Sequence, residues 1–119
     1  MLLSLHDGLA NTATLYTLIL AGWGFWRYAR GKGVDGSFLG AVVVGELLLI
    51  VQALAGVLLL GGGAQVDRGV HILYGVTALL SFPALYAFTR GRDSRREMLL
   101  WALLALFVFG VTIRARMVA

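Results

Sequence analysis

The sequence contains no cysteine, a single proline and few charged residues. Without cysteine the chain can form no disulfide, thiolate metal site or iron–sulfur cluster, and it has no cysteine nucleophile. Charged residues make up 13% of the 119 residues, against roughly 25% in ordinary soluble domains. A chain with so few charges lacks a normal water-facing surface, and this indicates a protein that folds in a membrane.

Apolar residues dominate what is present: they form 60% of the chain and fall into long blocks. The blocks cover residues 3–28, 38–60, 69–89 and 98–113. A transmembrane helix needs roughly 20 predominantly apolar residues. We therefore predict an all-α integral membrane fold, an antiparallel bundle of four transmembrane helices that forms a single domain over residues 1–119. Residues 1–7 have no basic segment and no small-residue cleavage site, so we expect the first block to be retained as a helix.

Basic residues cluster in the connections between the apolar blocks, and their distribution predicts the orientation. The first and third connections hold Arg27, Arg30, Lys32, Arg90, Arg92, Arg95 and Arg96, whereas the opposite side holds Arg68, Arg114 and Arg116. The positive-inside rule places the richer side in the cytoplasm. We expect a multi-pass protein of the inner (plasma) membrane with both termini outside the cytoplasm. The membrane lipid explains these charges, and we expect no nucleic-acid partner.

The only two histidines fall at matching places in the two halves of the chain. His6 lies 21 residues before Arg27, and His71 lies 19 residues before Arg90. This layout predicts two similar helical hairpins related by a pseudo-twofold axis, with both histidines near the outer surface. Two imidazoles that face each other across a bundle interior can ligate a haem iron. The alternative is that each histidine only hydrogen-bonds to headgroups or water at the membrane interface.

Residues 48–61 and 70–82 carry a resemblance to a known family. Gln52 and Gly56 form a Gln-x-x-x-Gly helix, which is followed by a loop and a helix that opens with His71. This pattern resembles the haem A synthase family, whose four-helix bundles bind haem through histidines on their first and third helices. The resemblance implies that His6 and His71 are the iron ligands. Leu3 and Asp7 stand where that family usually has an acidic and a basic residue, so the resemblance extends to haem binding and not to haem oxidation.

Other polar residues are candidates for supporting roles. We expect Arg68 and Arg114 to pair with haem propionates through charge-assisted hydrogen bonds, and Arg116 to anchor the interface. Glu46 and Gln52 lie within an apolar block, where polar groups are costly and often functional. Glu46 has two interpretations: it relays protons or binds a quinone headgroup, or it forms a packing hydrogen bond with Thr12, Thr14 or Ser81. For Gln52 we favour a structural role.

These observations predict a b-type cytochrome of the membrane, with haem b as the cofactor and one haem near the extracytoplasmic face. It would exchange electrons with a quinone or a partner subunit, within a larger membrane complex or a homodimer. Other four-helix b-type cytochromes, including the anchors of quinone-linked dehydrogenases, meet the same two-histidine requirement. The alternatives are a cofactor-free accessory subunit of a respiratory or photosynthetic complex, and a small transporter that uses Glu46. Whether the protein catalyses a reaction stays open.

Overall fold

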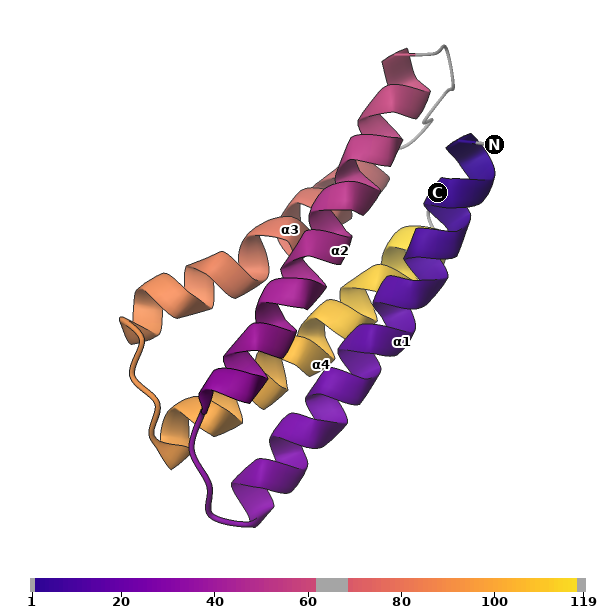
Figure 1. The fold of residues 1–119 in the computed structure, drawn as a ribbon. Helices are drawn as coiled ribbons and strands as arrows, with labels where there is room; N and C mark the ends of the chain where they lie inside the picture. The colour runs from indigo at the N-terminus through magenta and orange to yellow at the C-terminus, as the bar shows by residue number, and fades with distance from the viewer. Residues whose placement is uncertain (1, 62–68, 118–119) are drawn as a thin grey trace.

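The computed structural model describes residues 2–61 and 69–117, and these form four α-helices with two short loops (Figure 1). The helices are α1 (Leu2–Ala29), α2 (Gly36–Gly61), α3 (Gly69–Thr89) and α4 (Arg95–Met117). The molecule is 49 Å long and 23 × 21 Å across, so it is longer than the roughly 30 Å hydrocarbon core of a bilayer. The predicted all-helical fold with four helices is confirmed.

Three of the described helices are long and apolar enough to cross a membrane: α2, α3 and α4. The prediction of membrane-spanning helices is thus supported for these three by length and composition. The first helix, α1, is the longest but is not among them. Its first half carries polar residues on several faces, namely Ser4, His6, Asp7, Asn11, Thr12 and Thr14. These residues lower its apolar character, so α1 depends more than the others on neighbours inside the protein.

Side-chain caps decide where two of the helices begin. Asp35 precedes α2, and its carboxylate accepts a hydrogen bond from the backbone N–H of Phe38 at 2.8 Å. Ser94 precedes α4: its backbone N–H donates to the Glu97 carboxylate, which is one half of a capping box, and its hydroxyl donates to the same carboxylate. This cap starts α4 at Arg95, three residues before the apolar block that was predicted to begin at Met98.

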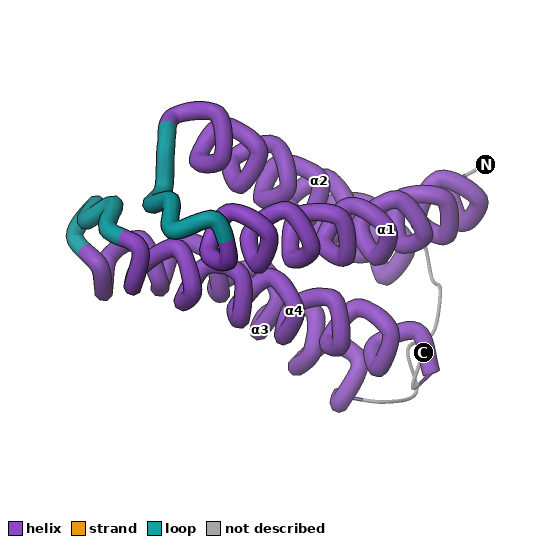
Figure 2. The backbone as a smooth tube through the Cα atoms, turned by 90° about the horizontal axis from the view of Figure 1, so that it is seen from below, coloured by secondary structure: helices purple, strands orange, loops and turns teal. Residues whose placement is uncertain are grey.

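The helices pack with α1 between α2 and α4, while α3 lies against α4 (Figures 1 and 2). Small residues bring α1 and α4 close together: a Cβ added at Gly24 would lie 2.9 Å from the Cβ of Ala102. Phe38, Phe82 and Met98 are fully buried in the core. The outward faces expose many large apolar side chains, such as Ile19 at 62%, as expected for surfaces that face lipid.

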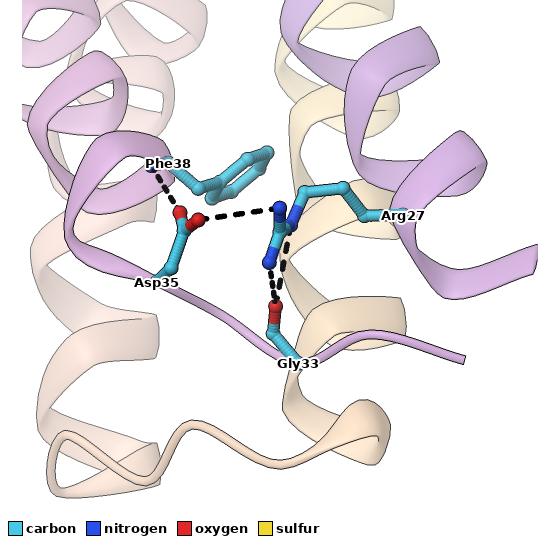
Figure 3. A network of polar contacts seen from close by, with 4 residues as sticks. All are labelled: Arg27, Gly33, Asp35 and Phe38. Atoms are coloured by element: carbon cyan, nitrogen blue, oxygen red, sulfur yellow. Dashed lines mark hydrogen bonds and ion pairs between the residues drawn. The ribbon is translucent and has the colours of Figure 1, made fainter. Parts of the chain in front are cut away.

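A polar network joins the end of α1 to the start of α2 (Figure 3). The Arg27 guanidinium donates to the carbonyl of Gly33 through Nε at 3.2 Å and Nη2 at 2.6 Å. It also forms an ion pair with Asp35 at 3.2 Å. Arg27 is mostly buried, so the network satisfies its charge at the point where the chain reverses direction.

The two described loops lie at the same end of the bundle and contact each other (Figure 2). The backbone N–H of Val34 donates to the carbonyl of Asp93 at 2.9 Å. Arg95 donates to the carbonyl of Tyr28 at 3.0 Å, and its guanidinium lies 4.1 Å from the Tyr28 ring centroid. These contacts connect the loop of the first hairpin directly to the loop of the second.

The contact between the two loops leaves no space for a side chain at position 33. A Cβ added at Gly33 would overlap the backbone carbonyl oxygen of Asp93. We expect Gly33→Ala to lower the free energy of unfolding by about 1–3 kcal/mol, because the loops must move apart. A detergent-based unfolding titration measures this change. Gly40→Ala is the control: a Cβ there meets nothing within 4 Å, and its effect should be neutral or stabilising. Equal stability of the two variants would contradict the prediction.

Candidate functional site

A cavity of about 430 Å³ lies between the helices at the end of the bundle opposite the loops. All four helices contribute to its walls, and most lining residues are apolar. Several are small: Ala10, Ala13, Ala53, Gly56, Gly75, Ala78 and Ala115. Small side chains leave space between the walls, and the volume falls in the range of roughly 300–1,000 Å³ that is typical of ligand and cofactor pockets.

Both histidines line this cavity, one from α1 and one from α3. The ring centroids of His6 and His71 lie 6.4 Å apart, and the ring planes meet at 73°. The rings are therefore close without being stacked on each other. The sequence placed them at the same level of the bundle, and the structure brings them together in one cavity.

His71 is held by the backbone of α4. Its Nδ1 lies 2.8 Å from the carbonyl oxygen of Ala115. A carbonyl can only accept a hydrogen bond, so Nδ1 carries the proton and Nε2 keeps a free lone pair. This is the usual arrangement of a metal-ligating histidine, in which one ring nitrogen donates to a fixed acceptor and the other is left to bind.

His6 has a different environment. Its Nδ1 is buried, and no described residue forms a hydrogen bond with it. A Cβ added at Gly56 would lie 3.3 Å from Cε1 of His6, so the glycine provides the space that the ring occupies. Leaving a buried nitrogen unsatisfied costs about 1–3 kcal/mol. The ring is thus available to a ligand that enters the cavity.

Gln52 and Glu46 are the other polar residues that the sequence singled out. Gln52 lines the cavity, and its Oε1 is buried without a hydrogen-bond partner among the described residues. Glu46 lies on the same helix outside the cavity, and its Oε1 is likewise buried and unpaired. The hydroxyls of Thr12, Thr14 and Ser81 donate to backbone carbonyls of their own helices. The structure therefore does not form the packing hydrogen bond that was expected for Glu46.

Of the two arginines that were expected to pair with propionates, only Arg114 lies among the described residues, and it is not at the cavity. Arg114 is exposed on α4 and is not part of the lining. Arg68 lies outside the described residues. Arg116 is exposed near the end of α4, also away from this cavity. Within the described part of the chain, Asp7 is the only lining residue that carries a formal charge at neutral pH.

Sequence reasoning missed the contribution of Ala115. Its role is carried by a backbone carbonyl, and a backbone group leaves no sequence signal. Tyr74 also lines the cavity, whereas Tyr16 does not. The Tyr16 hydroxyl instead donates to the carbonyl of Ala41 on α2.

The two histidines at the cavity fit a metal that is already bound in a macrocycle and needs few ligands from the protein. No group of three or more His, Cys, Asp or Glu residues that could hold a bare metal ion occurs in residues 2–61 and 69–117. A haem needs only axial ligands from the protein. His6 and His71, with ring centroids 6.4 Å apart in the cavity, are the residues that would hold such a group.

The fold and the cavity together define an all-helical protein in which three helices are apolar enough to cross a membrane, with a histidine pair in an apolar pocket. Comparisons with protein-family models, curated proteins and solved structures find no match to this chain.

The hydrogen bond of His71 predicts its tautomer, which a spectrum of the ¹⁵N-histidine-labelled protein without added cofactor can test. We expect one histidine, absent from the spectrum of His71→Ala, to carry its proton on Nδ1 at neutral pH because Ala115 offers only an acceptor. The ¹⁵N shifts of the two ring nitrogens report the tautomer. The signals of His6 serve as the internal control. A neutral His71 protonated on Nε2 would contradict the structure.

Proposed function

We propose that this protein is a b-type haem membrane protein folded as an antiparallel bundle of four transmembrane helices. His6 and His71 would hold one haem b near the extracytoplasmic face, and the haem would supply the redox chemistry by which the protein exchanges electrons with a quinone or with a partner subunit. The observation that carries the proposal is the meeting of the only two histidines of the chain across an apolar cavity, at a ring separation of 6.4 Å.

The environment of the histidines favours ligation over a simple interfacial role. A histidine that only contacts headgroups needs its ring nitrogens in water, but Nδ1 of His6 is buried. His71 already uses one nitrogen for Ala115, which directs the other to a different partner. Both histidines line the same pocket. Two residues with unrelated roles at the membrane interface would not be expected to converge on a single pocket.

The residues around the cavity would supply two histidine ligands and an apolar space for a haem, while no described cation lines the cavity to pair with its propionates. The bound haem would supply one-electron redox chemistry. Ala115 would fix the ring of His71 and raise its basicity as a ligand. The small residues of the four helices leave space for a macrocycle, and the apolar lining excludes water and so tunes the reduction potential.

Charge distribution supports the placement of the haem on the outer side. The loop end of the bundle, with the adjoining helix ends, carries most of the basic residues, for example Arg30 and Lys32 in a loop and Arg96 at the start of α4. The positive-inside rule assigns that end to the cytoplasm. The cavity lies at the opposite end and would then be on the extracytoplasmic side. The first turns of α1 and the last turn of α4 lie at that end as well (Figure 1).

A quinone is one candidate electron partner because α2 carries two unsatisfied polar groups. Oε1 of Gln52 is at the cavity, and Oε1 of Glu46 is six residues away along the same helix, nearer the loops. Six residues of helix correspond to about 9 Å. A quinone headgroup that hydrogen-bonds to a protonated Glu46 would therefore be close to the haem pocket.

Visible spectroscopy of the detergent-purified protein tests the proposal. We expect low-spin b-type bands in the reduced-minus-oxidised spectrum, with about one haem per chain by pyridine extraction. The double variant His6→Ala/His71→Ala should lose the haem, because both axial ligands are removed. Asn11→Ala is the matched control, since Asn11 is exposed on α1 and is not part of the cavity lining. A double variant that keeps full haem content would refute the proposal, and a colourless wild-type protein expressed with ample haem would favour the accessory subunit.

A second test fills the cavity without touching the histidines. A Cβ at Gly75 meets nothing within 4 Å, and this glycine lines the cavity. We expect Gly75→Leu to lower haem content at least several-fold while the fold is retained, because the side chain occupies the space of the macrocycle. Gly110→Leu is the control, since that glycine is equally open but away from the cavity. Haem content and circular dichroism measure the two effects, and equal haem content in both variants would contradict a haem in this cavity.

A further inference from the structure

The two histidines are held unequally, and this asymmetry has chemical consequences. The ring of His71 is anchored by a 2.8 Å hydrogen bond to the Ala115 carbonyl of α4. The ring of His6 has no hydrogen bond to any described residue, and its Nδ1 is buried without a partner. Gly56 lies beside the ring and, having no Cβ, leaves the space that the ring occupies.

A hydrogen bond to the second nitrogen strengthens a histidine as a metal ligand. It fixes the ring orientation and raises the basicity of the ligating nitrogen, and its removal typically lowers metal affinity 10- to 100-fold. His71 has such a bond and His6 lacks one. His71 is therefore the stronger of the two ligands.

The positions of the two residues in their helices increase the difference. His6 lies near the start of α1, and the preceding residues Leu3, Ser4 and Leu5 are exposed. Helix ends without caps or tertiary contacts open at low free-energy cost. His71 is also near a helix start, but its bond to Ala115 ties it to a second helix.

We propose, on the basis of the function proposed above, that His6 is the replaceable axial ligand and that its side of the haem is a binding site for a small diatomic ligand such as carbon monoxide. In this exchange the coordinate bond from the His6 nitrogen to ferrous iron breaks, and a bond from the carbon lone pair forms. The iron stays ferrous, no proton moves and His6 turns aside as a free imidazole.

The space around His6 suits such a ligand. Ala10 lies one helical turn from His6 on α1, and Ala53 lies one turn from Gly56 on α2. Both are small and line the same cavity. Most of the walls are apolar, and the one formally charged lining residue among those described is Asp7, which is acidic. A neutral diatomic molecule therefore enters more readily than an anion, which would lose its hydration and meet a negative charge.

Carbon monoxide added to the reduced, haem-loaded protein tests the proposal. His71→Ala should lose haem at least 10-fold more readily than His6→Ala. His6→Ala should keep haem through His71, show a five-coordinate spectrum and bind carbon monoxide rapidly at one molecule per haem. The wild type should bind it to the same final extent but more slowly, because His6 must first dissociate. Added imidazole should restore the six-coordinate spectrum of His6→Ala and slow carbon monoxide binding, which shows that the variant keeps an intact site.

The outcomes separate this inference from the proposed function. A wild-type protein that binds no haem overturns both. A wild-type protein that binds haem through both histidines, with equal haem loss in the two single variants or with the order reversed, overturns only the asymmetry. Wild-type protein that fails to bind carbon monoxide, while His6→Ala also excludes it, overturns the diatomic-ligand site.

Discussion

An apolar fold leaves its buried polar groups only the chain itself as a hydrogen-bonding partner, and most features of this structure follow from that constraint. Threonine and serine hydroxyls donate to carbonyls one turn back in their helices. Arg27 is neutralised by Asp35 and the Gly33 carbonyl. Against this background the unpaired atoms are informative. Three buried side-chain atoms have no partner in the described chain, on His6, Glu46 and Gln52, and the first and last of these residues line the cavity.

The two ends of the bundle differ in structure. At the loop end, charged residues and backbone hydrogen bonds connect both hairpins, and Gly33 allows the loops to touch. At the other end, small side chains leave an apolar space around the two imidazoles. The contacts between the loops therefore join the helices at one end, while a cavity separates them at the other.

Composition was sufficient to predict the four helices, because long apolar runs of the right length allow few other structures. The proximity of His6 and His71 could be predicted because successive connections lie at opposite ends of the bundle. The starts of α1 and α3, and with them both histidines, then fall at the same end. The earlier start of α4 was missed because the Ser94 cap lies in a charged stretch outside the apolar block. The Ala115 carbonyl and the contact of Val34 with Asp93 could not be predicted, since backbone groups far apart in sequence meet only through tertiary packing. The sequence showed only that Arg114 lies at the same end of the bundle as the histidines. The rotation of α4 about its own axis, which turns Arg114 outward, is set by helix packing.

The packing of α1 against α4 links the order of the helices along the chain to the order in which they can pack. Of the described helices, only α1 is not among those long and apolar enough to cross a membrane, and one of its main neighbours, α4, follows it only after two further helices. The hydroxyl of Thr14 on α1 lies 3.0 Å from that of Thr112 on α4, for instance, and this contact forms only after α4 has been made. The packing of α1 is therefore completed only when the fourth of these helices is present.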